Sequence, residues 1–454
     1  MKLSLSEIAT ITNGQLVGDD GVAYGISTDT RDLQKGSLFV ALVGENFDPH
    51  KLIEADKADK AVAVLVNKQL RAKCSQIVVG DTYKALQRIA RFWREKFDIP
   101  VIGVTGSNGK TSVKELIKKI LETQGNVLAT IGNLNNHIGV PLTLARLDET
   151  HRYAVVEMGA NHSGEIAALT QIAKPDIGVV TNIGPAHLEG FGSIEGVARA
   201  KSELYQNLNP QGVAVVNMDE IFKNTWKNNI GDRMQITFGL EQRADVSCKK
   251  INSDLIEVST PIGAVRVRMQ ALGQHTLYNI SAATAACLGL GTDLEDIKAG
   301  LEAAKSLPGR LMRLAGIGGS HIWDDTYNAN PASLFAALDV QSQEDGEHWL
   351  VLGNMGELGE ERIGLHKKAG EMAKEHGVAR LYGLGDLTKH SVDAFGAGAE
   401  HYSSHKALVE ALQKNIYENV CVLVKGSRAM HMEKIVNGIR KNVKSEATCN
   451  EHAA

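Results

Sequence analysis

The 454-residue sequence lacks any unbroken apolar run of about 18 residues, the minimum for a helix that crosses a lipid bilayer. It also lacks an apolar segment near Met1, where a secretory signal peptide would require one and where Glu7 stands instead. Nor does it have an excess of basic residues, since the net charge is −4 at pH 7. From these absences we expect no membrane insertion, no export and no nucleic-acid partner.

Cysteine is scarce, and the cysteines form neither a C-x-x-C pair nor a cluster with histidine that would suggest a metal site. An odd number of widely separated cysteines does not predict a disulfide framework. It is typical of a protein in a reducing compartment, so we expect a cytoplasmic location. The five cysteines are Cys74, Cys248, Cys287, Cys421 and Cys449.

The sequence does have an ordinary globular composition, with 43% hydrophobic and 22% charged residues, in a chain longer than one hydrophobic core usually organises. We therefore predict an α/β fold with three domains. Short alternating runs predict a small α/β domain over residues 1–82, with strands at 37–43, 61–66 and 76–79. A helix over residues 83–97 opens a central domain at 83–310, and a Pro308-Gly309 break precedes a C-terminal domain at 311–454.

The central domain repeats a unit in which a β-branched run is followed by a loop and an amphipathic segment. This pattern predicts a parallel sheet covered by helices, with strands at 101–105, 153–158, 177–182 and 213–217. The C-terminal domain repeats the pattern and is expected to be Rossmann-like, with strands at 321–325, 349–352, 380–384 and 420–425. Because open α/β sheets bind ligands at the carboxyl ends of their strands, polar residues at those ends are the candidates for function.

The strongest local signal is a glycine-rich turn that joins the first central strand to an amphipathic helix of P-loop type. Gly106 and Gly109 would let backbone N–H groups approach phosphate oxygens, Lys110 would meet the terminal phosphates, and the Thr111 hydroxyl would bind Mg²⁺. Val104 occupies the first glycine position of the general motif, so the turn is a variant, and a plain strand-turn-helix corner is the alternative. The predicted nucleotide-binding residues here are Thr105, Gly106, Ser107, Asn108, Gly109, Lys110, Thr111 and Ser112.

Glu157 lies at the end of an apolar strand in the sheet that carries the glycine-rich turn. A carboxylate there is costly to bury unless a cation compensates, and Mg²⁺ accepts one or two carboxylates together with phosphate oxygens. Glu157 with Thr111 is therefore a predicted magnesium site, and a solvated strand-end carboxylate is the alternative. His187 and Lys201 carry no such signal by themselves, and a hydrogen-bonded loop histidine and a surface lysine are the default interpretations.

Several longer stretches of the sequence resemble the Mur ligases, and the resemblance extends over essentially the whole chain. The glycine-rich turn is similar to the ATP loop of that family, and Gly273, His275 and Asn279 are similar to its G-x-H-N-x-x-N element. Four stretches resemble in particular the members that join D-alanyl-D-alanine to UDP-N-acetylmuramoyl-tripeptide. These stretches are residues 133–141, 157–165, 324–331 and 425–433.

The resemblance implies an ATP-dependent amide ligase that uses Mg²⁺. In the family pattern, Lys110 and Thr111 handle the β- and γ-phosphates, and Glu157 and His187 bind the metal. Lys201 matches a lysine that is carbamylated in several members and there helps to hold a second metal. The resemblance thus implies catalytic roles for Lys110, His187 and Lys201, and contacts to ATP by Asn279, Arg310 and Asp325.

The resemblance also assigns the substrates to domains, with the UDP-sugar on the N-terminal domain and the amino substrate and part of the nucleotide on the C-terminal domain. The segment at 27–31 resembles the uridine-binding segment, and an exposed ion pair between Asp29 and Arg31 is the alternative. The loop at 133–141 resembles the one that faces the muramoyl peptide, and a turn stabilised by asparagine side chains is the alternative there. The implied substrate-binding residues, in an expected monomer, are Ser27, Thr28, Arg31, Asn133, Asn136, His137, Asn328 and Asn330.

The implied reaction first activates a carboxylate, because a free carboxylate has no adequate leaving group. The γ-phosphoryl group of ATP would pass to the tripeptide carboxylate, the amine of D-alanyl-D-alanine would attack the acyl phosphate, and closure of the C-terminal domain would exclude water.

Thr276 and Asn354 depart from the family pattern, which leaves an adenine contact at 276 and a charge at 354 without support. The alternatives are another Mur ligase, a folate polyglutamylating enzyme or, from a different class, a P-loop nucleotide switch.

Overall fold

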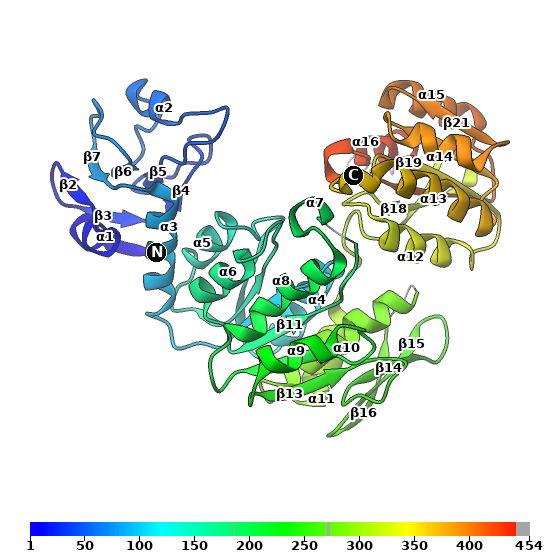
Figure 1. The fold of residues 1–454 in the computed structure, drawn as a ribbon, viewed down its shortest axis with the longest axis horizontal. Helices are drawn as coiled ribbons and strands as arrows, with labels where there is room; N and C mark the ends of the chain where they lie inside the picture. Colours follow the sequence, from blue (N-terminus) through cyan, green and yellow to red (C-terminus); the bar gives the residue numbers. More distant parts are fainter. Residues whose placement is uncertain (186, 270–272, 442–454) are drawn as a thin grey trace, which may run out of the picture. The chain divides into compact units, whose positions relative to one another are not determined.

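The structure, a computed structural model, describes residues 1–185, 187–269 and 273–441, so Cys449 lies outside the described residues. The chain forms two compact units. The first comprises the described residues within 1–183, 195–271 and 276–304, and the second those within 184–194, 272–275 and 305–454. Figure 1 follows the chain through both units from blue to red.

The N-terminal part of the first unit contains the predicted strands and the predicted helix. Its elements are β1 (Lys2–Ser4), α1 (Leu5–Thr12), β2 (Gln15–Val17), β3 (Val22–Tyr24), β4 (Ile26–Ser27), β5 (Leu38–Val40), α2 (His50–Glu54), β6 (Ala63–Val66), β7 (Ser75–Val78) and α3 (Thr82–Arg94). Five strands form a sheet in the order β2-β7-β6-β5-β4, in which only β2 is antiparallel to its neighbour. Both faces are buried, because Leu65 packs with Ile89 of α3 and Val64 packs with Ile53 of α2.

A parallel sheet forms the centre of the first unit, as the sequence predicts, but it has six strands, and those at 126–129 and 234–238 were not among the four predicted. Its strands are β8 (Val101–Thr105), β9 (Asn126–Ala129), β10 (His151–Glu157), β11 (Ile177–Val180), β12 (Val213–Asn217) and β13 (Met234–Phe238), in the order β13-β12-β11-β8-β10-β9. The helices of this region are α4 (Lys110–Leu121), α5 (Gly139–Leu144), α6 (Glu165–Ala173), α8 (Ile194–Gln206), α9 (Lys223–Ile230), α10 (Gln274–Leu288) and α11 (Leu294–Ala303). The glycine-rich turn follows β8, which lies between β11 and β10, so residues from both neighbouring strand ends surround it.

A three-stranded antiparallel sheet in the first unit was not predicted from the sequence. It consists of β14 (Ser247–Lys250), β15 (Leu255–Thr260) and β16 (Gly263–Arg268). Ile256, Val258 and Val267 belong to the same apolar cluster as Ile117 of α4 and Ile280 of α10. The small sheet is therefore part of the core that supports the helix after the glycine-rich turn.

The second unit is built on a six-stranded sheet in which β17 alone is antiparallel. Its strands are β17 (Met312–Ala315), β18 (His321–Asp325), β19 (Glu347–Gly353), β20 (Arg380–Leu384), β21 (Ala399–Tyr402) and β22 (Val420–Lys425), in the order β17-β18-β22-β19-β20-β21. The helices are α7 (Leu188–Phe191), η1 (Ile317–Gly319), α12 (Pro331–Gln341), η2 (Gly359–Glu361), α13 (Arg362–Glu375), α14 (Thr388–Phe395), α15 (His405–Asn415), η3 (Arg428–Met430) and α16 (Glu433–Ile439). All four predicted strands of this region are present, and both faces of the sheet are buried by apolar clusters.

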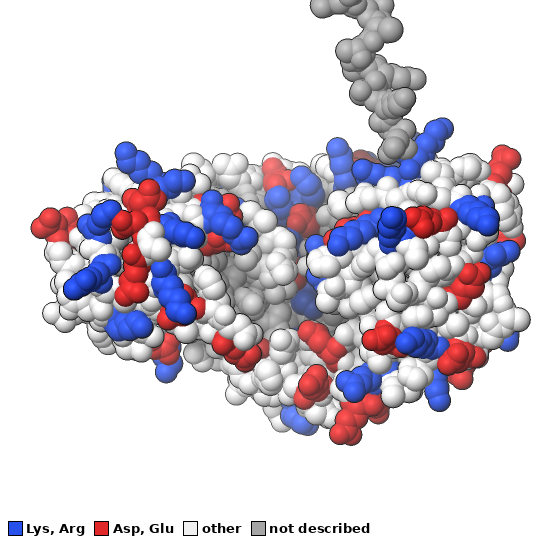
Figure 2. All heavy atoms as spheres, turned by 90° about the horizontal axis from the view of Figure 1, so that it is seen from above, with Lys and Arg blue, Asp and Glu red and all other residues white. Residues whose placement is uncertain are grey.

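The surface carries charges of both signs. On the face drawn in Figure 2, Lys and Arg side chains are interspersed with Asp and Glu side chains. In the part of the chain that the structure describes, no helix combines the length and the apolar character needed to cross a membrane.

Candidate active site

The glycine-rich turn lies between β8 and the N terminus of α4, as predicted. Gly109 is the N-cap of the helix with φ of 80°, and Gly106 has φ of 143°, conformations that residues with a side chain rarely adopt. Neighbouring side chains leave no room for a Cβ atom: one at Gly106 would lie 1.9 Å from Thr181 Oγ1, and one at Gly109 would lie 2.4 Å from Asn279 Oδ1. The turn therefore requires both glycines, and it lies directly against Asn279, which the sequence analysis had assigned to the same nucleotide site.

The turn is held in shape from the end of β11 by Thr181 and Asn182. Ser107 N donates to the Asn182 carbonyl oxygen and Asn108 N donates to Asn182 Oδ1, both at 2.9 Å. The Thr181 hydroxyl donates to the Asn108 carbonyl oxygen at 2.6 Å. These bonds fix the turn before any ligand binds, which reduces the ordering cost of binding. The sequence analysis did not identify Asn182, because its contact with the turn depends on the order of strands in the sheet.

Lys110 is the first residue of α4, and its ammonium group lies over the turn. Nζ donates to the carbonyl oxygens of Gly106 at 2.8 Å and Ser107 at 3.2 Å. The N terminus of the helix adds positive potential from its aligned peptide dipoles. A lysine charge and a helix N terminus at one turn favour an anion such as a phosphate group.

Glu157 is the last residue of β10 and pairs in the parallel register with Val104, just before the turn. Its side chain is only 1% exposed, which argues against a solvated carboxylate. Oε1 accepts a hydrogen bond from Asn135 Nδ2 at 2.8 Å, whereas Oε2 is buried and has no hydrogen-bond partner among the described residues. A buried carboxylate oxygen without a donor is unfavourable unless a cation compensates its charge. The environment of Glu157 therefore fits the predicted magnesium ligand.

Lys201 of α8 is buried, in contrast to the surface position that is the default for a lysine. Its side chain is 1% exposed, and Nζ donates to the Ala160 carbonyl oxygen at 3.4 Å. Burial, with a smaller contribution from the positive charge of Lys110, lowers the pKa of Lys201 to about 7. A large fraction of this amine is therefore neutral and nucleophilic near pH 7.

His187 belongs to the second unit, whereas Thr111 and Glu157 belong to the first. His187 immediately precedes α7, and its Nδ1 lies 2.5 Å from Oε2 of Glu357. Both residues have a left-handed backbone conformation, with φ of 54° at His187 and 60° at Glu357. Among the residues that the structure describes, no three or more His, Cys, Asp or Glu side chains are grouped as a metal site. The assignment of His187 to a metal therefore stays a prediction.

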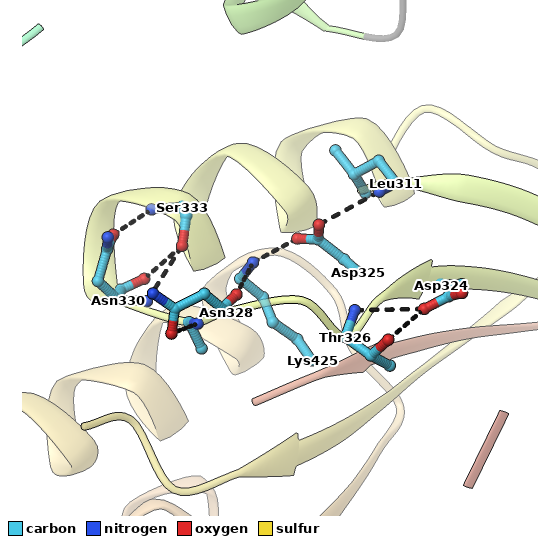
Figure 3. A network of polar contacts seen from close by, with 9 residues as sticks. Leu311, Asp324, Asp325, Thr326, Asn328, Asn330, Ser333 and Lys425 are labelled. Carbon is cyan, nitrogen blue, oxygen red and sulfur yellow. Dashed lines mark hydrogen bonds and ion pairs between the residues drawn. The ribbon is translucent and has the colours of Figure 1, made fainter. Parts of the chain in front are cut away.

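Asp325 forms a buried ion pair with Lys425 where β18 and β22 end side by side (Figure 3). The Lys425 side chain is 2% exposed, and its Nζ bonds to Asp325 Oδ2 and donates to the Asn328 carbonyl oxygen at 3.0 Å. Asp325 Oδ1 accepts a hydrogen bond from Leu311 N at 3.2 Å. The pair thus fixes the loop that follows β18, which contains two of the residues predicted to contact substrate, Asn328 and Asn330.

The same loop is ordered further by a helix cap and by a cation-π contact. Asn330 is the N-cap of α12, where its side chain accepts a hydrogen bond from Ser333 N at 2.9 Å in a capping box. The guanidinium group of Arg310 lies 4.1 Å from the centre of the Tyr327 ring. Asn330 therefore has a structural role, and its role in substrate binding stays a prediction together with those of Arg310 and Asn328.

The segment predicted to bind uridine contains the ion pair that was its alternative interpretation. Arg31 NH2 lies 2.5 Å from Asp29 Oδ2, and the Arg31 side chain is 87% exposed. Hydrogen bonds from Arg31 lower the pKa of Asp29 to about 2. The Ser27 hydroxyl donates to the Asp29 carbonyl oxygen at 2.9 Å, which closes the turn. An exposed guanidinium does not by itself identify a ligand, so Ser27, Thr28 and Arg31 remain predicted substrate contacts.

The loop before α5 also has the asparagine-stabilised turn that was its alternative interpretation. Asn136 Oδ1 accepts hydrogen bonds at 2.9 and 3.1 Å from two backbone N–H groups at the start of α5. The ring of His137 lies 5.6 Å from the ring of Tyr83. The contacts of this loop with the muramoyl peptide stay predictions. Asn135, which bonds to Glu157, is the residue of this loop that the sequence analysis missed.

Asn354, one of the two departures from the family pattern, has a clear structural role. Its Oδ1 accepts hydrogen bonds from Leu387 N at 3.1 Å and Thr388 N at 3.3 Å, at the start of α14. An amide oxygen satisfies both donors. The loss of a carboxylate charge at this position is therefore compatible with the local structure.

Comparison with known proteins gives two family matches. The Mur ligase middle domain matches residues 104–287, and the Mur ligase, glutamate ligase domain matches residues 309–428. The chain is also similar to the UDP-N-acetylmuramoyl-tripeptide–D-alanyl-D-alanine ligase of Escherichia coli (strain K12). The two are 39% identical over 449 residues, which cover 97% of this chain and 99% of the relative.

Two solved structures are similar to this one over most of their length. The first is MurF from Acinetobacter baumannii, with a TM-score of 0.89 and 34% identity, covering 96% of this chain and 98% of that one. The second is MurF ligase from Thermotoga maritima in complex with ADP, with a TM-score of 0.80 and 27% identity, covering 92% and 97%.

Proposed function

Because this chain belongs to the Mur ligase family, we propose that it is an ATP-dependent ligase that adds D-alanyl-D-alanine to UDP-N-acetylmuramoyl-tripeptide. The products are UDP-N-acetylmuramoyl-pentapeptide, ADP and phosphate, and the reaction makes a precursor of peptidoglycan. The observation that carries the proposal is the 39% identity, over nearly the full length of both chains, to a ligase of this specificity.

The chemistry that we propose proceeds through an acyl phosphate. The bond between the β,γ-bridging oxygen and the γ-phosphorus of ATP breaks as a tripeptide carboxylate oxygen bonds to that phosphorus, which releases ADP. The dipeptide amine then attacks the acyl carbon and phosphate leaves. Lys110 and the N terminus of α4 supply positive potential for the phosphates, and the rigid turn aligns them for in-line transfer. Asn279, which lies against Gly109, is the nucleotide contact that we propose on α10.

We assign Mg²⁺ to Glu157 and Thr111, because Glu157 Oε2 is buried without a donor and Thr111 lies in the first turn of α4. Bound Mg²⁺ would neutralise charge on the phosphate oxygens during transfer. His187 is proposed as a further metal ligand on the family resemblance alone.

The remaining proposed assignments also rest on the resemblance. Arg310 and Asp325 are assigned to the nucleotide, and the residues assigned to the substrates are Ser27, Thr28, Arg31, Asn133, Asn136, His137, Asn328 and Asn330. We further propose that the protein works as a monomer in the cytoplasm.

Phosphate release tests the proposed function. Purified protein with ATP and Mg²⁺ should release phosphate only when both the UDP-linked tripeptide and D-alanyl-D-alanine are present, and mass spectrometry should show one pentapeptide product for each phosphate. Phosphate release with ATP alone would indicate an autonomous ATPase. Release that requires a different amino substrate would indicate another ligase of the family.

We propose that Lys201 is carbamylated, as its counterpart is in several family members. The neutral amine would add to CO₂ with loss of one proton, which gives a carbamate anion suited to a metal. A pKa of about 7 leaves most of the amine reactive at pH 8 and little of it reactive at pH 6. Protein incubated with ¹³C-bicarbonate should therefore show a carbamate carbon signal by NMR that grows as the pH rises from 6 to 8.

Two variants test this assignment. Lys201→Met should abolish the carbamate signal, whereas Lys114→Met should retain it, because Lys114 is also buried but its ammonium is paired with Glu115. Lys201→Ala should lose most of its ligase activity and regain part of it when a short carboxylate is added. Full activity of Lys201→Ala without any addition would contradict the assignment.

A further inference from the structure

The two carboxylate oxygens of Glu157 have different surroundings. Oε1 accepts a hydrogen bond from Asn135 Nδ2 at 2.8 Å, while Oε2 is buried without a hydrogen-bond partner among the described residues. The backbone N–H of Glu157 is also fixed, since it donates to Thr130 Oγ1 at 3.0 Å. One oxygen therefore already accepts a hydrogen bond, and the other is the one left without a partner for a cation to satisfy.

Asn135 is itself held in place by the residue that lies two positions after Glu157. Gly159 N donates to the Asn135 carbonyl oxygen at 2.8 Å. A Cβ atom at Gly159 would lie 2.9 Å from Asn135 Oδ1, so the amide group packs directly on the glycine backbone. This packing directs the NH₂ end of the amide toward Glu157.

The partner of Glu157 is a neutral amide, and this affects the charge at the site. An ammonium or guanidinium group bonded to Glu157 would neutralise the carboxylate and weaken its attraction for a cation. Lys114, a buried lysine of the same region, instead donates to the Thr130 carbonyl oxygen at 2.8 Å and pairs with Glu115. Asn135 thus orients Glu157 without itself neutralising the carboxylate.

We propose that Asn135 is a positioning residue that makes Glu157 bind its cation through one oxygen only, and so makes the site prefer Mg²⁺ to Ca²⁺. This inference rests on the proposed function, which supplies the magnesium nucleotide. Mg²⁺ requires near-octahedral geometry at short distances and binds few carboxylates, whereas Ca²⁺ takes six to eight oxygens and accepts a carboxylate through both. The amide hydrogen bond to Oε1 fixes the orientation of the carboxylate and competes with the two-oxygen mode that suits the larger ion.

Binding of ADP by isothermal calorimetry, at increasing concentrations of MgCl₂ or CaCl₂, tests the inference without relying on turnover. In Asn135→Ala, the Mg²⁺ concentration that gives half-maximal ADP binding should rise about 10-fold, the usual size of an effect from a residue behind a metal ligand. The Ca²⁺ requirement should stay the same or fall, because both oxygens of Glu157 become available. The preference for Mg²⁺ over Ca²⁺ should therefore shrink by about the same factor.

Asn209→Ala is the matched control. Asn209 Nδ2 also donates to a carboxylate of the same unit, Asp176 Oδ1, at 3.0 Å. Asp176 lies just before the amino end of β11, whereas Glu157 lies at the carboxyl end of β10, where the glycine-rich turn is. This variant should leave the requirement for both metals unchanged. If Asn135→Ala lowers the melting temperature by more than a few degrees, Asn135→Leu replaces it, because leucine is close to asparagine in volume, is uncharged and has no donor for Glu157, so the same loss of preference for Mg²⁺ is expected.

Each outcome distinguishes between possibilities. An unchanged preference in the Asn135 variants, or an equal loss of binding with both metals, would mean that Asn135 has only a structural role and would overturn the inference. If the unaltered protein bound ADP without any dependence on metal, the assignment of Mg²⁺ to Glu157 would fail and the inference with it, whereas the proposed ligase function would still be decided by the phosphate-release assay. If ADP binding depends on metal in the unaltered protein, and the preference for Mg²⁺ over Ca²⁺ is smaller in the Asn135 variants, the result supports both the magnesium site at Glu157 and the positioning role of Asn135.

Discussion

Replacement of Lys110 with methionine should lower kcat for pentapeptide formation by about 10³-fold, the scale expected when a positive group is removed from the site of developing charge. Lys110 places its ammonium over the glycine-rich turn, within 3.2 Å of two carbonyl oxygens of that turn. Methionine keeps the length of the side chain but removes the charge. Steady-state kinetics with saturating ATP and both peptide substrates would measure the loss.

Lys119→Met is the matched control for Lys110→Met. Lys119 lies on the same helix, α4, and forms an exposed ion pair with Glu122 at 2.6 Å. Its loss should change kcat by less than about 2-fold, because Lys119 lies in the last turn of α4, at the opposite end from the glycine-rich turn, and because an exposed pair contributes little to stability. Unaltered turnover in Lys110→Met would rule out the phosphate-binding role of the turn, provided that its melting temperature matches that of the control.

Replacement of Lys425 with methionine should lower the free energy of unfolding of the second unit by about 3–5 kcal/mol, because it leaves Asp325 charged and poorly compensated in a largely buried position. The double variant Lys425→Met/Asp325→Asn should be more stable than Lys425→Met alone, since it removes the uncompensated charge. Hydrogen exchange of the backbone amides of β18 and β22 at increasing urea concentrations would report on this unit, whereas tryptophan fluorescence would also follow Trp93 and Trp226 of the first unit.

An exposed lysine-aspartate pair of the same unit provides the control for Lys425. Lys389 lies 3.4 Å from Asp386, and their side chains are 57% and 94% exposed. Lys389→Met should cost less than about 0.5 kcal/mol, as expected for a solvated pair. If Lys425→Met and Lys389→Met had equal effects, the buried pair would not stabilise the loop after β18 as described.

Much of the fold was predictable because the relevant signals are local in the sequence. The strands at 321–325, 380–384 and 420–425 match β18, β20 and β22. Each has a short group of buried apolar residues, and in β22 this group is continuous up to Lys425, as expected for a strand that is buried on both faces. The glycine-rich turn was predictable for the same reason, because the strand, the glycines and the helix follow each other directly. The sheet of β14, β15 and β16 was missed, since β16 is largely exposed and has few apolar residues beyond Val265 and Val267.

The partners of the site residues were not predictable, because they depend on contacts between distant parts of the chain. Lys425 and Asp325 are 100 residues apart, and no local pattern links them. Asn135 is 22 residues from Glu157 and lies in an irregular loop. Lys201 has the sequence context of a surface helix, and only the packing of α8 shows that its amine is buried. Sequence alone thus identified candidate side chains, whereas their charge states and hydrogen bonds required the tertiary structure.

The strand order of the second unit has a consequence for biosynthesis. β22 is the last strand that the structure describes, yet it lies in the middle of the sheet, between β18 and β19. While the ribosome is still making the chain, β18 and β19 therefore lack the neighbour that joins them, even though β17, β18, β19, β20 and β21 have already emerged. The first unit can complete its central sheet during translation, but the second must wait for nearly the whole polypeptide. A nascent chain arrested before Val420 would expose two unpaired strand edges, the kind of surface that chaperones protect from aggregation.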